Sequence, residues 1–144
     1  MKKLAALLVL ALTLTACGGT KVTTANHEYK YTDSNGAEQT IFVDVTLENG
    51  KIKEITIDET YGDSTKKALG TDYLMSVYAG TWEWDVQIGH LEKALVGTDG
   101  KIALDENGYP TDSKVTATPD ATSGCTIGLT EIQKAILEAI AEAK

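Results

Sequence analysis

A run of small and hydroxyl-bearing residues, Asp120 to Thr126, has the residue types that can hold a phosphate group. Ser123 and Thr126 supply hydroxyl groups, and Gly124 allows a ligand to approach the backbone closely. The following segment, Leu129 to Ala143, has the periodicity of an amphipathic helix. The first turn of such a helix presents unpaired N–H groups and the positive end of its dipole. The run therefore predicts a phosphate-binding turn or, alternatively, an ordinary capping loop.

The spacing within this run also carries a family resemblance. Asp120, the Ser123–Gly124 pair and Thr126 form the pattern D-x-x-S-G-[small]-T, with Cys125 at the small position, where Ala is usual. This pattern resembles the flavin-attachment motif of the FMN-binding domain family. That family includes peripheral subunits of the Rnf complex and of the sodium-translocating NADH:quinone reductase, and many small exported lipoproteins. The resemblance implies that FMN is joined through its phosphate to the hydroxyl of Thr126.

The resemblance implies a function in electron transfer. Family members receive FMN from a separate exported FMN transferase and exchange electrons with a redox partner, which the sequence does not identify. The chain has no second domain for NADH or quinone, so we expect an electron carrier and not an enzyme. Two alternatives remain open: a lipoprotein binding or surface module of the same fold without flavin, and a secreted hydrolase. For a hydrolase, no nucleophile–base pair is evident.

The N-terminus predicts export and a lipid anchor. A basic start, Met1 to Lys3, precedes the apolar run Leu4 to Leu14, which is too short to span a bilayer but suits a signal peptide. The sequence Leu-Thr-Ala-Cys at 14–17 resembles the lipobox of bacterial lipoproteins, in which the cysteine is acylated. We therefore expect a signal peptide at 1–16, a lipidated tether at 17–26 and an FMN-binding domain at 27–144. The alternatives are an ordinary secretory signal and a buried helix.

Cysteine content and charge argue against a disulfide-rich protein, a metal-binding protein and a nucleic-acid-binding protein. With Cys17 acylated, Cys125 is left unpaired, so no disulfide framework is expected, and no Cys/His cluster predicts a metal site. The net charge of the whole chain is −8. Removal of residues 1–16 takes away two lysines and no acid, which leaves 11 of the 13 basic residues against 21 acidic ones, a net charge of −10. Such a domain is not expected to bind nucleic acid or, without acyl chains, an anionic membrane surface.

Alternation of apolar and polar residues predicts an antiparallel meander. Strands are expected at His27–Thr32, Thr40–Glu48 and Ile52–Asp58. Turns are expected at Asp33–Gly36 and Asn49–Gly50, since Asn-Gly favours two-residue hairpins. Ile41, Val43, Val45 and Leu47 should share one face of the second strand. With the helices below, this predicts the α+β class, an antiparallel sheet packed against helices.

Four helical segments and two short strands complete the expected fold. The first segment is a helix capped by Asp63–Ser64 and ended by Gly70, and the second consists of helical turns within Thr71–Tyr78. The third is a helix at Glu83–Val96, and the fourth is the C-terminal helix. The apolar face of the third should comprise Val86, Ile88, Leu91, Ala94 and Leu95. The spacing of Thr130 and Gln133 predicts a capping box at the start of the last helix. Its buried face should comprise Ile132, Ala135, Ile136, Ala139, Ile140 and Ala143. Short strands are expected at Ile102–Leu104 and Val115–Thr118.

A few further side chains are candidates for contact with a flavin. Tyr78, Trp82 and Trp84 could stack on the ring, although aromatic residues at such spacing also serve as core packing. His90 could donate a proton, or could be a structural histidine. The acidic pairs at 58–59 and 105–106 lack the spacing of calcium ligands, and we expect them to be solvated.

Overall fold

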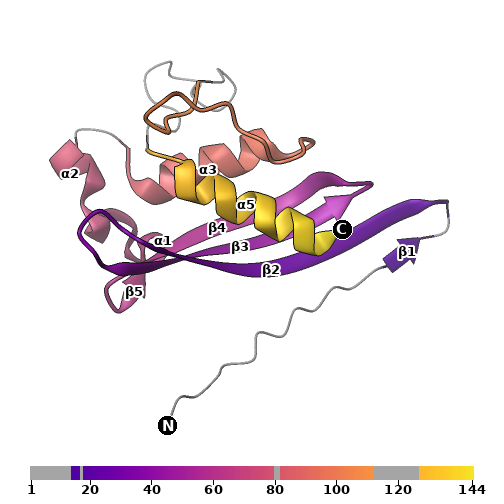
Figure 1. Ribbon diagram of the computed structural model, residues 1–144, viewed down its shortest axis with the longest axis horizontal. Helices are drawn as coiled ribbons and strands as arrows, with labels where there is room; N and C mark the ends of the chain where they lie inside the picture. Colours follow the sequence, from indigo (N-terminus) through magenta and orange to yellow (C-terminus); the bar gives the residue numbers. More distant parts are fainter. Residues whose placement is uncertain (1–13, 17, 80–81, 112–126) are drawn as a thin grey trace, which may run out of the picture.

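The computed structural model describes residues 14–16, 18–79, 82–111 and 127–144 (Figure 1). Several features predicted from the sequence lie outside these residues: most of the signal segment, Cys17, the motif at 120–126 and the candidate strand at 115–118.

The sheet contains five antiparallel strands in the order β1-β2-β3-β4-β5 (Figure 1). The strands are β1 (Leu14–Ala16), β2 (Thr20–Thr32), β3 (Glu38–Glu48), β4 (Lys51–Tyr61) and β5 (Ser64–Thr65). Asn49 and Gly50 have φ angles of 52° and 79°, the left-handed conformation that a tight hairpin between β3 and β4 requires. The predicted meander is confirmed.

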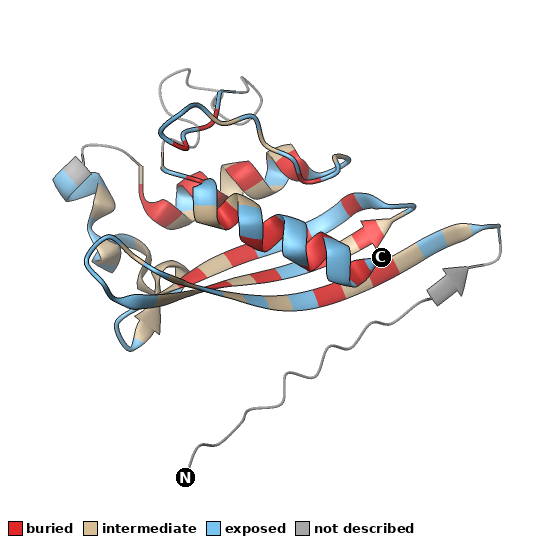
Figure 2. Ribbon diagram, viewed as in Figure 1, coloured by how far each residue is buried: buried red, intermediate tan, exposed pale blue. Residues whose placement is uncertain are grey.

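Two long helices cover one face of this sheet (Figures 1 and 2). These two helices are α3 (Trp84–Leu95) and α5 (Thr130–Ala143). The shorter helical elements are α1 (Lys66–Leu69), the 3-10 helix η1 (Gly70–Tyr73) and α2 (Met75–Ala79). α5 packs against β2 and β3, and α3 packs against β4. The predicted inward face of β3 and the predicted face of α5 are both buried. The α+β class is therefore confirmed, with one core between the sheet and the two helices.

The first long strand begins earlier than predicted. Residues 20–26 belong to β2 and do not form a tether, because they pair with β3 in register from Val22 opposite Glu48 to Asn26 opposite Asp44. Ala25 within this stretch is 1% exposed. The polar composition of the stretch favoured a loop, and pairing with a distant strand overrides that local preference.

The helix starts also differ from the prediction. The cap of α1 is Thr65, whose hydroxyl accepts a hydrogen bond from Ala68 N, whereas Gly70 ends the helix as predicted. α5 has no capping box, because Leu129 is its N-cap and no side chain caps it. The Gln133 side chain instead accepts from Ile102 N at 2.6 Å and donates to Gly100 O at 3.0 Å. Gln133 thus ties the loop after α3 to the last helix.

Two smaller corrections concern α3 and the loop that follows it. Val86 is 40% exposed, whereas Gln87 is fully buried and donates to Trp82 O at 2.8 Å. Residues 102–104 do not form a strand; Leu104 makes an isolated bridge with Pro110.

Candidate functional site

A cavity of about 220 Å³ lies where β2, β3 and β4 meet α1, η1 and the starts of α2, α3 and α5. Its walls are mainly aromatic and aliphatic, from Tyr31, Ile41, Tyr73, Met75, Trp84, Ile127 and Ile132. Lys66, Glu59 and Glu131 are the charged residues among those that line it. The cavity therefore combines aromatic and aliphatic side chains with charged groups that can fix the orientation of a small molecule.

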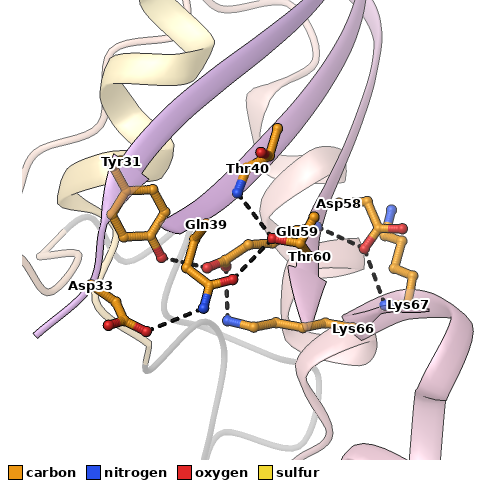
Figure 3. Close-up of polar contacts among 9 residues, drawn as sticks. All are labelled: Tyr31, Asp33, Gln39, Thr40, Asp58, Glu59, Thr60, Lys66 and Lys67. Atoms are coloured by element: carbon orange, nitrogen blue, oxygen red, sulfur yellow. Dashed lines mark hydrogen bonds and ion pairs between the residues drawn. The ribbon is translucent and has the colours of Figure 1, made fainter. Parts of the chain in front are cut away.

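A buried carboxylate, that of Glu59, joins two other polar residues that line the cavity (Figure 3). Glu59, only 4% exposed, accepts a hydrogen bond from the Tyr31 hydroxyl at 2.5 Å on one oxygen and from Lys66 Nζ at 2.8 Å on the other. Because each carboxylate oxygen has a donor, the charge is compensated and both donors are held in place.

The Lys66 ammonium also faces two aromatic rings. Its Nζ lies 5.5 Å from the ring centre of Tyr73 and 5.3 Å from that of Trp84. Trp84 is 2% exposed and belongs to the core as well as to the cavity wall. Cation–π attraction adds to the ion pair, since both rings lie within the roughly 6 Å over which it acts.

The tyrosines on β2 have titration behaviour set by their carboxylate partners. Burial, and then the hydrogen bond to Glu59, raise the pKa of Tyr31 well above its usual range. The Tyr29 hydroxyl donates to Glu131 at 2.7 Å, and this hydrogen bond raises the pKa of Tyr29. The Lys134 ammonium, 2.8 Å away, lowers the pKa of Glu131. Both tyrosines therefore remain protonated donors at neutral pH.

A second layer of hydrogen bonds fixes the backbone that carries Lys66 (Figure 3). Asp58 accepts from Lys67 N at 3.1 Å, which joins the start of α1 to β4. The Thr60 hydroxyl accepts from Thr40 N and donates to the Gln39 side chain, both at 2.9 Å. The position of Lys66 therefore depends on the register of β3 and β4 as well as on its own ion pair.

The motif at 120–126 lies outside the described residues, whereas the residues that directly follow it are described. Ile127 and Gly128, which directly follow Thr126 in the sequence, line the cavity. The first turn of α5 begins two residues later at Thr130.

The three aromatic candidates do not form one group. Trp84 lines the cavity, whereas Tyr78 on α2 is 83% exposed and is not among the lining residues. Trp82 is also outside the lining set, and its ring centre lies 5.3 Å from that of His90.

Three polar residues of this site were not predicted from the sequence. Glu59 was expected to be solvated, and this expectation is wrong, because Glu59 lies on the inward face of β4 in phase with Ile55 and Ile57. An acidic residue in phase with an apolar face was the sequence signal for it. Lys66 and Tyr31 gave no comparable signal, since the fold alone brings them to Glu59.

No protein-family model, no curated protein and no solved structure matches this chain. Among the described residues, no group of three or more histidines, cysteines or acids is arranged to hold a metal ion. None of the helices in the described ranges is long and apolar enough to cross a membrane.

Proposed function

We propose that this protein is an exported, membrane-anchored electron carrier that holds FMN, with the flavin phosphate joined to the hydroxyl of Thr126. One observation carries the proposal. The residues that follow the flavin-attachment motif, Ile127 and Gly128, form part of the wall of a cavity lined largely by aromatic and aliphatic side chains. The motif supplies an attachment chemistry, and the adjoining cavity supplies a place for a flat ring.

The residues of the cavity fit the ring of a flavin. Trp84 and Tyr73 provide aromatic side chains, and the Lys66 ammonium provides donors for ring carbonyl and nitrogen atoms. The volume of about 220 Å³ is below the range of roughly 300–1,000 Å³ typical of sites that enclose a drug-sized ligand. The cavity therefore suits the ring portion of FMN and not the whole nucleotide.

When bound, FMN would supply the one- and two-electron chemistry of the protein. The chain's own residues would bind and insulate it. Trp84 is a nearly buried aromatic residue of the cavity wall, and Lys66, held by Glu59, presents a fixed donor there. Because the resemblance is to electron-transfer proteins, we propose a carrier and not an enzyme.

The proposed compartment and partners rest on the sequence resemblances. We propose cleavage before Cys17, acylation of its sulfur and retention at the outer face of the bacterial cell membrane or another extracytoplasmic membrane. Multiple acyl chains are needed for this, because a single chain binds a bilayer only marginally. An exported FMN transferase would load the flavin, and a separate redox protein would exchange electrons with it.

The test is an intact mass after export in a host that also produces an FMN transferase. We expect a gain of one FMN less water, on the peptide that contains Thr126. Thr126→Ala should remove the gain, whereas Thr122→Ala, a neighbouring hydroxyl in the same motif, should retain it. Flavin that is present but released on denaturation would refute the covalent link only. Wild-type protein with no bound flavin would refute the proposal and favour a binding module of the same fold.

A further inference from the structure

Lys66 is the single cation among the described residues that line the cavity. Its side chain is 15% exposed, and that of its partner Glu59 is 5% exposed. The other acid of the cavity, Glu131, is engaged at 2.8 Å by Lys134 and at 2.7 Å by the Tyr29 hydroxyl. The charge on this side of the cavity is therefore set mainly by the Lys66 ammonium and the Glu59 carboxylate.

The ammonium of Lys66 has donors to spare for a ligand. A lysine ammonium carries three N–H donors. Within the described part of the chain, one of them is used in a hydrogen bond, to Glu59. The rings of Tyr73 and Trp84 hold the ammonium by their faces and accept no conventional hydrogen bond from it. The Lys66 ammonium is thus fixed in position and still has N–H donors available for a ligand.

Such a charge acts strongly on anything bound beside it. The side chains of Lys66 and Glu59 are largely buried, and charges near a protein interior interact several times more strongly than charges in bulk water. Two-electron reduction of a flavin takes two electrons from a donor and one or two protons from water, so negative charge builds up on the ring unless protons or fixed cations offset it. An adjacent ammonium favours the reduced form.

We infer that Lys66 raises the reduction potential of the flavin held in this cavity, and that Glu59 is a positioning residue that holds the ammonium and moderates its charge. This inference rests on the proposed function. It follows from the geometry that the two residues act in opposite directions: loss of the ammonium disfavours reduction, and loss of the carboxylate's charge leaves the ammonium less neutralised and favours it.

The experiment is a reductive titration of the flavin-loaded protein with dithionite, in which the absorbance of bound FMN is followed against the measured solution potential. Lys66→Met should lower the equilibrium constant for reduction at least tenfold, which is about 30 mV for a two-electron couple. Glu59→Gln keeps the shape and acceptor oxygen of the side chain and should shift the potential upward. Lys66→Arg retains the charge and should stay closer to wild type than Lys66→Met.

A matched control is the neighbouring Lys67→Met. Lys67 forms an ion pair with Glu92 at 2.5 Å and does not line the cavity, so its loss should leave the potential unchanged. If the Lys66–Glu59 pair had a purely structural role, Lys66→Met and Glu59→Gln would both lower the melting temperature. Their flavin reduction potentials would then not differ from each other.

The outcomes separate the two proposals. Wild-type protein that takes up no flavin overturns the proposed function, and this inference with it. Flavin-loaded wild-type and Lys66→Met proteins with equal potentials overturn the inference and leave the carrier function intact. Should Lys66→Met fail to fold, an upward shift in Glu59→Gln supports the inference, and a downward or absent shift overturns it.

Discussion

Gly100 is a position at which the fold depends on the absence of a side chain. It is buried, has φ of +83°, and lies against α5. A Cβ atom added there would overlap Ile140 Cδ1 and approach Ile136 Cγ2 to 3.0 Å. Both isoleucines are core residues, 3% and 0% exposed, so they can make room only by repacking against their neighbours. Gly100→Ala should therefore strain the backbone and overpack the contact with α5.

The two costs can be separated with a matched glycine. Gly36 in the β2–β3 turn has the same φ of +83° and nothing within 4 Å of an added Cβ. Gly36→Ala should lower the free energy of unfolding by about 1–2 kcal/mol, from backbone strain alone. Gly100→Ala adds about 1–3 kcal/mol of overpacking, for a total of about 2–5 kcal/mol. The total is a large share of the roughly 5–15 kcal/mol that stabilises a typical domain.

The assay is equilibrium unfolding in urea, followed by the fluorescence of the buried Trp84 and by far-ultraviolet circular dichroism. Ile140→Val shortens the side chain that the new Cβ overlaps. Alone it should cost about 0.5–1.5 kcal/mol, whereas in the Gly100→Ala background it should be neutral or stabilising. Equal losses for Gly36→Ala and Gly100→Ala, or strict additivity of Gly100→Ala with Ile140→Val, would show that the packing argument is wrong.

Two further predictions concern polar contacts. Since burial and the bond to Glu59 raise the pKa of Tyr31 in the folded state, its contribution to stability is fully present below the unfolded value of about 10 and is lost as pH rises towards the raised value. Urea unfolding at pH 8 and pH 11 should show a smaller loss for Tyr31→Phe than for wild type, with the exposed Tyr109→Phe as control; an equal loss would contradict the assignment. Gln133→Ala leaves backbone groups of the loop at 100–102 unpaired and should cost about 1–3 kcal/mol. Thr130→Ala, at the predicted cap that does not form, should change stability by about 0.5 kcal/mol or less. A larger loss of stability for Thr130→Ala than for Gln133→Ala would instead support the predicted capping box.

The parts of the fold that were predictable are those set by local periodicity. Alternation from Ile41 to Leu47 placed the core face of β3, and a 3.6-residue repeat placed every buried residue of α5. The Asn49–Gly50 turn was predictable because few residues adopt left-handed torsions at both central positions.

What the sequence did not reveal depends on contacts between distant segments. The start of β2 at Thr20 is created by pairing with β3, and the role of Gln133 by a loop more than thirty positions earlier in the chain. The candidate site divides in the same way. The motif ending at Thr126 is visible as a string of residues, whereas Tyr31, Glu59 and Lys66 come together only when β2, β4 and α1 are assembled.

The early start of β2 has a consequence for how far this protein reaches. Under the proposed acylation of Cys17, only two glycines separate the lipid from Thr20, a span of at most about 10 Å. From Thr20 the strand runs to Tyr31 at the cavity, roughly 35 Å away at the rise of an extended strand. β2 would then act as a rigid spacer that fixes the greatest height of the cavity above the bilayer. A partner that exchanges electrons with this protein would have to present its own redox centre within that height, and residues inserted at Gly18–Gly19 would change the reach while leaving the domain unaltered.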